Sequence, residues 1–118
     1  MEAREIVGQY FIKGKNQSAE IDFTYEGILT LTLDEHERFV AHWLIGDQEQ
    51  HATGFFKDGI LVLNFHYTGD DDLIYKGVAV YRCLDAHTLN GFWSEKYGDP
   101  NYLGEELCTR LLGDGYLN

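Results

Sequence analysis

Apolar and polar residues alternate in short segments along almost the whole chain. Residues 18–25 show the pattern most clearly, with Ala19, Ile21, Phe23 and Tyr25 on one face and polar residues on the other. Residues 28–33 and 39–45 repeat it. Because successive side chains of a β-strand point to opposite faces, this alternation predicts strands that bury one face and expose the other.

About nine strands are predicted, at intervals of roughly 8 to 14 residues, and no helix. They cover residues 6–13, 18–25, 28–33, 39–45, 50–57, 60–67, 73–82, 88–95 and 105–112. Two of them contain interior glycines, Gly77 and Gly91, which mark a bend, a bulge or a close backbone approach. A small barrel needs such features to close. Short turns favour an up-and-down order. We therefore expect an all-β fold, a single antiparallel up-and-down β-barrel of eight or nine strands, in one domain over residues 1–118.

The first hairpin is predicted from the positions of the apolar residues. A three-residue loop at Tyr25-Glu26-Gly27 pairs Phe23 with Leu29 and Ile21 with Leu31, which keeps the apolar faces together. The same alternation predicts the core of the barrel. Its expected members are Tyr10, Ile21, Phe23, Leu29, Leu31, Phe39, Trp43, Phe56, Leu61, Leu63, Phe65, Val78, Val80 and Trp93.

The chain is acidic, with 9 basic and 20 acidic residues and a formal net charge of −11. This charge argues against nucleic acid and against an anionic membrane surface as partners, because both bind through clustered Lys and Arg. No secretory signal and no apolar run of about 20 residues is apparent. Cys83 and Cys108 form no CxxC motif, and we expect a cytoplasmic protein with reduced thiols. Whether the two cysteines lie close together is open.

Both ends of the chain carry a resemblance to a known group of barrels. Gly8-Gln9-Tyr10 and Thr109-Arg110-Leu111 are similar to the terminal motifs of calycin barrels, the group that includes lipocalins, fatty-acid-binding proteins and avidins. Tyr10 stands where those families have Trp. The resemblance implies that the Arg110 side chain packs across Tyr10 and closes one end of the barrel. The size of the chain is more similar to the avidin type, but only Trp43 and Trp93 match its aromatic set, so biotin binding is not expected.

The long loop after residue 95 is the candidate ligand site. Aromatic and polar side chains gather at this barrel mouth, a mixture that is typical of small-molecule sites. The alternative is a rim of tyrosines that only packs over the barrel end. The predicted ligand-binding residues are Trp93, Glu95, Tyr97, Asn101 and Tyr102, together with Tyr10 and Arg110.

Three histidines are predicted to share one face of the barrel. Asp58-Gly59 is the strongest hairpin signal in the chain, and it sets His51 opposite His66. A four-residue loop at residues 46–49 would set His51 opposite Leu44, with His42 as a diagonal neighbour. Three imidazoles on neighbouring strands are candidates for holding a zinc-type ion. The alternative, which we favour at this point, is a solvated outer face without a metal or any other cofactor.

Catalysis has little support in the sequence. No serine stands in a Gly-x-Ser-x-Gly motif, and no glycine-rich phosphate loop is present. Glu105 and Glu106 are adjacent in a strand and therefore point to opposite faces, so they cannot act as a carboxylate pair. We expect a non-enzymatic binding module that holds a small, partly apolar ligand at one barrel mouth. The alternative is a structural or protein-interaction domain, a homodimer with a filled barrel and no ligand.

Overall fold

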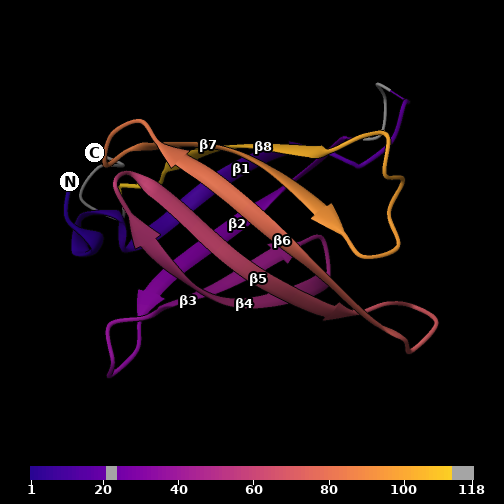
Figure 1. Ribbon diagram of the computed structural model, residues 1–118, viewed down its shortest axis with the longest axis horizontal. Coiled ribbons are helices and arrows are strands. Elements are labelled where there is room, and N and C mark those ends of the chain that lie inside the picture. Colours follow the sequence, from indigo (N-terminus) through magenta and orange to yellow (C-terminus); the bar gives the residue numbers. More distant parts are fainter. Residues whose placement is uncertain (21–23, 113–118) are drawn as a thin grey trace.

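The structure is a computed structural model that describes residues 1–20 and 24–112. Within these residues, eight antiparallel strands close into a barrel in which each strand pairs with its neighbours in sequence and β1 pairs with β8 (Figure 1). This confirms the predicted all-β, up-and-down barrel. The elements are η1 (Ala3–Ile6), β1 (Gly8–Lys15), β2 (Thr24–Leu33), β3 (Phe39–Ile45), β4 (Gln48–Lys57), β5 (Ile60–Thr68), β6 (Ile74–Cys83), β7 (Thr88–Glu95) and β8 (Gly104–Arg110).

The connections alternate between the two ends of the barrel (Figure 1). The short 3-10 helix η1 lies at the end that also holds the β2–β3, β4–β5 and β6–β7 connections, and we call this the η1 end. The β7–β8 connection, residues 96–103, lies at the other end, which we call the long-loop end. Among the described residues, no helix is both long enough and apolar enough to span a bilayer.

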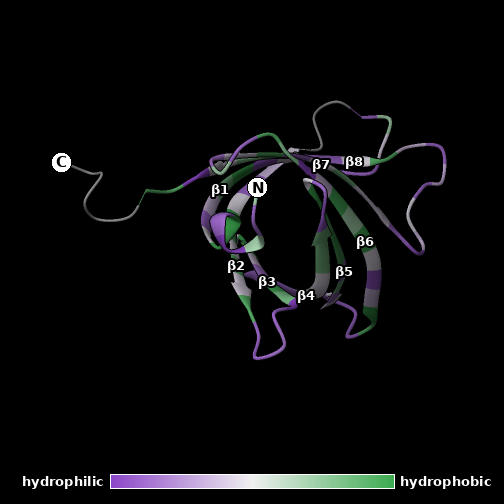
Figure 2. Cartoon of the chain, turned by 60° about the vertical axis from the view of Figure 1, so that its left-hand side comes forward, coloured by the Kyte–Doolittle hydropathy of each residue, from purple (hydrophilic) through white to green (hydrophobic). Residues whose placement is uncertain are grey.

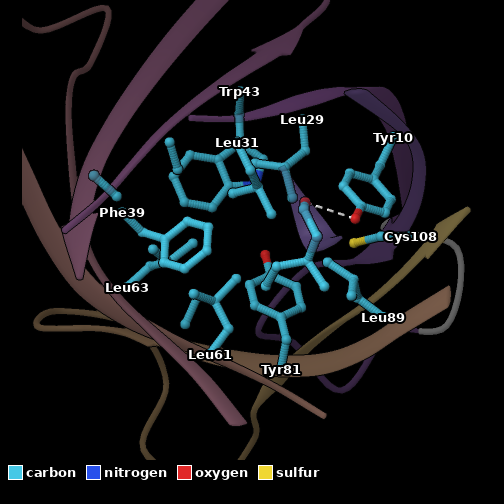
Figure 3. Close-up of a cluster of buried hydrophobic side chains, with 14 of the residues drawn as sticks. Tyr10, Leu29, Leu31, Phe39, Trp43, Leu61, Leu63, Tyr81, Leu89 and Cys108 are labelled. Atoms are coloured by element: carbon cyan, nitrogen blue, oxygen red, sulfur yellow. Dashed lines mark hydrogen bonds between the residues drawn. The ribbon is translucent and has the colours of Figure 1, made fainter. Parts of the chain in front are cut away.

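Alternate side chains of the strands point into the barrel, as in β3, where Phe39, Ala41 and Trp43 are buried. Figure 2 shows hydrophobic and hydrophilic segments along β6. Figure 3 shows side chains from both halves of the chain converging on one core. Eight of the predicted core residues are buried, and Phe56 and Trp93 are partly buried against them. Ile21 and Phe23 lie outside the described residues. The buried eight are Tyr10, Leu29, Leu31, Phe39, Trp43, Leu61, Leu63 and Phe65.

The predicted hairpin at Tyr25-Glu26-Gly27 is wrong. These residues belong to β2, which runs unbroken through them, and Leu29 pairs with Tyr10 on β1 and with Trp43 on β3. A Cβ atom on Gly27 would come within 2.4 Å of the carbonyl oxygen of Leu44. The glycine therefore serves the close approach of β3 to β2 rather than a turn.

The predicted inward face of β6 is also wrong. Val78 is 42% exposed, whereas Ala79, Tyr81 and Cys83 are buried. Both faces of β6 are apolar, so alternation alone does not decide which face points inward. The neighbouring strand does: Tyr81 lies opposite Gly91, and a Cβ atom on that glycine would come within 2.4 Å of the tyrosine ring. The ring fits inside because its partner has no side chain.

The two turns that flank β4 test the predicted strand registers. The Asp58-Gly59 hairpin is confirmed, because His51 pairs with His66 across β4 and β5. The four-residue loop at residues 46–49 is wrong, because Ile45 pairs with Gln48 and only Gly46 and Asp47 lie between the strands. Gly46 has φ +63°, the left-handed conformation that two-residue hairpins require. His51 therefore lies directly opposite His42.

Candidate functional site: a cavity at the long-loop end

A cavity of about 110 Å³ lies inside the barrel, toward the long-loop end. An apolar cavity of about 150 Å³ accommodates benzene, so this one has room for a group somewhat smaller than a benzene ring. Its walls are mainly aromatic, with acidic and amide side chains between the rings. The lining residues are Asn16, Tyr25, Trp43, Ile45, Gln48, Gln50, Phe65, Tyr67, Ala79, Tyr81, Trp93, Glu95 and Glu106.

Four of the aromatic rings that line the cavity lie opposite glycines on the adjacent strands. A Cβ atom on Gly14 would come within 2.1 Å of the Tyr25 ring, and one on Gly104 within 2.0 Å of the Trp93 ring. Each ring therefore occupies space that the neighbouring strand leaves empty, which fixes its direction. The pairs are Tyr25 with Gly14, Phe65 with Gly77, Tyr81 with Gly91, and Trp93 with Gly104.

Phe65 is the centre of this aromatic cluster. Its ring centroid lies 6.1 Å from that of Trp43 and 6.1 Å from that of Trp93, and both pairs are edge-to-face. Tyr67 stacks on Phe65 with ring centroids 6.4 Å apart. Edge-to-face pairs are a favoured packing of aromatic rings, so these four rings form one packed wall of the cavity.

A buried carboxyl group, Glu106, lies at the inner wall of the cavity. Its side chain accepts hydrogen bonds from the hydroxyl groups of Tyr25 (2.5 Å) and Tyr81 (2.6 Å) and from the indole N–H of Trp43 (3.3 Å). The hydroxyl of Tyr25 in turn accepts a hydrogen bond of 2.9 Å from the indole N–H of Trp93. Both tryptophans of the chain are thus connected to Glu106.

Burial shifts the pKa values of Glu106 and of the two tyrosines bonded to it. It raises the pKa of Glu106 above its usual value, while four donors partly oppose this rise: Tyr25, Tyr81, Trp43 and the thiol of Cys108, which lies 3.9 Å from Glu106 Oε1. Burial and the nearby carboxylate also raise the pKa of Tyr25 and that of Tyr81 far above the usual range, so both hydroxyls stay protonated and remain donors. The carboxyl group of Glu106 and its four donors, Tyr25, Trp43, Tyr81 and Cys108, therefore form one hydrogen-bonded network.

Within residues 1–20 and 24–112, Glu106 takes part in no ion pair. None of the described residues that line the cavity is Lys or Arg. A second carboxylate, Glu95, lies near the mouth and accepts a hydrogen bond from Tyr67. The cavity therefore combines two acidic groups with a wall of aromatic rings.

Gln17, in the β1–β2 connection, is hydrogen-bonded to the end of β7 and to the β7–β8 loop beside the mouth of the cavity. The Gln17 amide oxygen accepts a hydrogen bond from the backbone N–H of Glu95 (3.0 Å), and its amide nitrogen donates to Ser94 Oγ (3.1 Å) and to the carbonyl of Asp99 (2.9 Å). A shallow hollow beside Gln17, lined in part by Tyr67, Trp93 and Glu95, continues the cavity toward the surface.

The structure divides the predicted ligand-binding residues among three places. Trp93 and Glu95 line the cavity. Tyr97, Asn101 and Tyr102 lie on the surface of the β7–β8 loop, outside the cavity lining, and Tyr97 is 74% exposed.

Tyr10 and Arg110 lie at the η1 end. The guanidinium carbon of Arg110 lies 5.0 Å from the centroid of the Tyr10 ring, which is the contact that the resemblance to calycin barrels implies. The side chain of Arg110 donates hydrogen bonds to the carbonyls of Val7 (2.9 Å), Glu5 (2.5 Å) and Ala86 (2.6 Å) and to the Tyr10 hydroxyl (2.9 Å). These bonds join η1, the β6–β7 connection and β8.

Sequence reasoning missed Glu106, the most informative residue of the cavity. Glu105 and Glu106 do point to opposite faces, as predicted, and Glu106 is buried. The signal that could have found it is the position of Cys108, a residue type that is usually buried, two places further along the same strand. Cys83 and Cys108 are both buried free thiols, with Leu89 of β7 between them.

The three candidate histidines lie in one row on the outer face of the barrel. His42 pairs with His51 across β3 and β4, and His51 pairs with His66 across β4 and β5. Their ring centroids are 5.1 Å apart for His42 and His51 and 6.0 Å apart for His51 and His66. The row is separate from the cavity, which none of the three lines.

Comparison with known proteins shows the fold and no more. No protein family model matches the chain, and no curated protein matches it by sequence. A solved structure that is similar to it is a protein of unknown function from the DUF3598 family of Nostoc punctiforme, with a TM-score of 0.55 and 10% sequence identity. The similarity covers 94% of this chain and 49% of the other, so this chain spans about half the length of that protein. The calycin resemblance stays a prediction.

Proposed function

We propose that the protein is a binding module for a small organic cation, such as an amine or a quaternary ammonium group with a short apolar tail. The single observation that carries the proposal is the buried carboxyl group of Glu106 at the wall of an aromatic cavity, with no basic side chain among the lining residues. A buried carboxylate without a positive partner is costly. A cationic ligand would supply that partner.

The aromatic walls favour the same class of ligand. A positive charge within about 6 Å of the face of a Trp, Tyr or Phe ring is attracted to the ring, and Trp43, Phe65, Tyr67 and Trp93 border the cavity. An anionic ligand would instead meet Glu95 and Glu106 at short range. The size of about 110 Å³ limits the buried part to a small head group, so a tail would lie in the hollow beside Gln17.

Tryptophan fluorescence tests the proposal directly, because both tryptophans of the chain line the cavity. Tetramethylammonium and butylammonium are expected to give a saturable change. Butanol and butyrate, which have the same length as butylammonium but no positive charge, are expected to give a much weaker response or none. An equal response to butyrate would overturn the choice of a cation.

Glu106→Gln and Glu105→Gln form a matched pair of variants. Each removes one carboxylate, but Glu106 lies at the cavity and Glu105 is exposed on the outer face. We expect Glu106→Gln to weaken butylammonium binding at least tenfold, which corresponds to about 1.4 kcal/mol, and Glu105→Gln to leave it unchanged. Equal losses would show that only the overall charge matters. If no probe binds and light scattering finds a dimer, the alternative of a homodimeric interaction domain replaces the proposal.

A further inference from the structure

The outer wall of the barrel carries a second group of side chains with the chemistry of a binding site. His42, Glu49 and His51 each offer one ligand atom, and these three atoms all lie within 4.8 Å of one another. His42 Nε2 and Glu49 Oε1 already share a hydrogen bond of 2.8 Å. The three side chains come from β3 and β4 on either side of the two-residue turn at Gly46 and Asp47.

We propose that His42, Glu49 and His51 bind a divalent transition-metal ion of the Zn²⁺ class. Imidazole nitrogen together with one carboxylate oxygen is a donor set that zinc accepts, at about 2.0–2.2 Å from each atom. Ligand atoms on a tetrahedral ion are then roughly 3.3 Å apart. Glu49 and His51 are exposed and His42 is half-buried, so rotations of these side chains would bring atoms that lie within 4.8 Å of one another to that spacing. Three protein ligands leave one position for water.

The strand register makes the arrangement stiff. His42 and His51 are direct cross-strand partners, and paired residues hold their Cβ atoms about 4.5–5.5 Å apart. Their rings lie 5.1 Å apart between centroids. The ion would replace the proton that His42 and Glu49 now share, so the existing hydrogen bond already brings two of the three ligands together.

His66 is not assigned as a ligand, although it continues the row. Its ring centroid lies 6.0 Å from that of His51, and it is not part of the three-atom group. Lys76 lies opposite His66 on β6, and its positive charge opposes a cation at that side. On the opposite flank, His42 pairs with Thr30 on β2, which is neutral.

The test uses the whole protein after treatment with a chelator. We expect Zn²⁺ and Ni²⁺ to raise the melting temperature and to bind with a stoichiometry near one by calorimetry, because an ion that binds only the folded state stabilises it. Mg²⁺, which prefers oxygen ligands, should give no shift. No shift with either Zn²⁺ or Ni²⁺ would overturn the proposal.

Three variants assign the binding to these residues. His51→Ala and Glu49→Gln each remove one ligand and should weaken Zn²⁺ binding at least tenfold. His36→Ala is the matched control. His36 also lies next to a carboxylate, that of Glu35 at 3.6 Å, but it does not belong to the proposed metal site. It should bind Zn²⁺ as the unmodified protein does. Equal affinity in His51→Ala, or an equal loss in His36→Ala, would overturn the proposal.

The result is independent of the cavity: His51→Ala should respond to butylammonium as the unmodified protein does.

Discussion

At the η1 end of the barrel, a tyrosine hydroxyl and an arginine side chain are hydrogen-bonded to main-chain carbonyl groups. At the long-loop end, two tyrosine hydroxyls are hydrogen-bonded to a buried carboxyl group. In both networks the buried polar atoms are hydrogen-bonded, since every buried side-chain nitrogen or oxygen among the described residues has a hydrogen-bond partner. The difference lies in the space beside them.

The network around Arg110 joins separate segments of chain, whereas the network around Glu106 borders a cavity. At the η1 end the guanidinium group is surrounded by acceptors and lies on the Tyr10 ring. At the long-loop end the carboxyl group has donors on one side and about 110 Å³ of space on the other. We infer that the η1 end contributes mainly to stability and the long-loop end mainly to binding. Five predictions test this contrast, and the largest expected effect comes first.

Arg110→Ala should be the most destabilising single change. It removes four hydrogen bonds to Glu5, Val7, Ala86 and Tyr10 and leaves part of these acceptors without a donor. Hydrogen bonds to charged groups make a net contribution of about 1.5–3 kcal/mol each. Arg110 is only half-buried, so water can replace some of these bonds, and we expect a loss of about 3 kcal/mol in urea unfolding. Arg110→Lys should recover only part of it, because lysine lacks the planar set of donors. A loss below about 1 kcal/mol would contradict the inference that the η1 end contributes mainly to stability.

Tyr10→Phe and Tyr81→Phe form a matched pair across the two ends. Each removes one hydroxyl from a side chain that is at most 1% exposed, and each should lower the free energy of unfolding by about 1–2 kcal/mol. Only Tyr81→Phe should change butylammonium binding, because its hydroxyl is bonded to Glu106 at 2.6 Å whereas that of Tyr10 is bonded to the Ile6 carbonyl (Figure 3). Equal effects on binding would contradict the division between the ends.

The raised pKa of Glu106 predicts a specific pH dependence. Between the usual pKa of a glutamate, about 4.3, and the raised pKa of the folded state, the folded protein holds a proton that the unfolded chain has lost. The free energy of unfolding therefore falls as the pH rises through that window. Glu106→Gln lacks this contribution, so its stability relative to the unmodified protein should improve from pH 4 to pH 7. An opposite trend in urea unfolding would contradict the raised pKa.

Binding of a cation should shift the same equilibrium in the opposite direction. A positive charge beside Glu106 favours the ionised carboxylate, so butylammonium affinity should rise with pH across the titration of Glu106. The pH profile of tryptophan fluorescence titrations measures this rise. Glu105→Gln should keep the profile and Glu106→Gln should flatten it.

Tyr97→Ala should have the smallest effect of the set. Its ring is 74% exposed on the β7–β8 loop and has Lys96 as a cation–π neighbour at 5.3 Å. We expect less than about 0.5 kcal/mol in stability, as for most surface substitutions, and less than a twofold change in butylammonium affinity. A larger change in affinity would extend the site from the cavity onto the loop.

The architecture could be predicted because strand alternation and turn chemistry are local signals. Asp58-Gly59 gave the correct pairing of His51 with His66, since a two-residue turn leaves little freedom in register. The role of Gly27 was predicted wrongly. A glycine that follows a polar residue, here Glu26, is as compatible with a turn as with a close approach between two strands. The carbonyl of Leu44 that requires it comes from a segment 17 residues away in the sequence (44 − 27).

The site was harder to predict, because its residues are defined by their partners across the barrel. Glutamate is a residue type that is usually exposed. The burial of Glu106 depends on donors from other strands, the hydroxyls of Tyr25 on β2 and Tyr81 on β6 and the indole of Trp43 on β3. Val78 and Val80 were placed in the core because they are as apolar as Ala79 and Cys83, which point inward on the same strand. The glycines opposite the rings would have decided the question, but only once the strand pairs were known.

The pairing of β1 with β8 has a consequence for the order in which the protein acquires its functions during synthesis. The first strand cannot be completed until the final one has left the ribosome, and contacts so distant in sequence are slow to form. Glu106 sits on that final strand, whereas His42, Glu49 and His51 come from a local hairpin. The proposed metal ligands are therefore all synthesised well before the last strand of the proposed cation site.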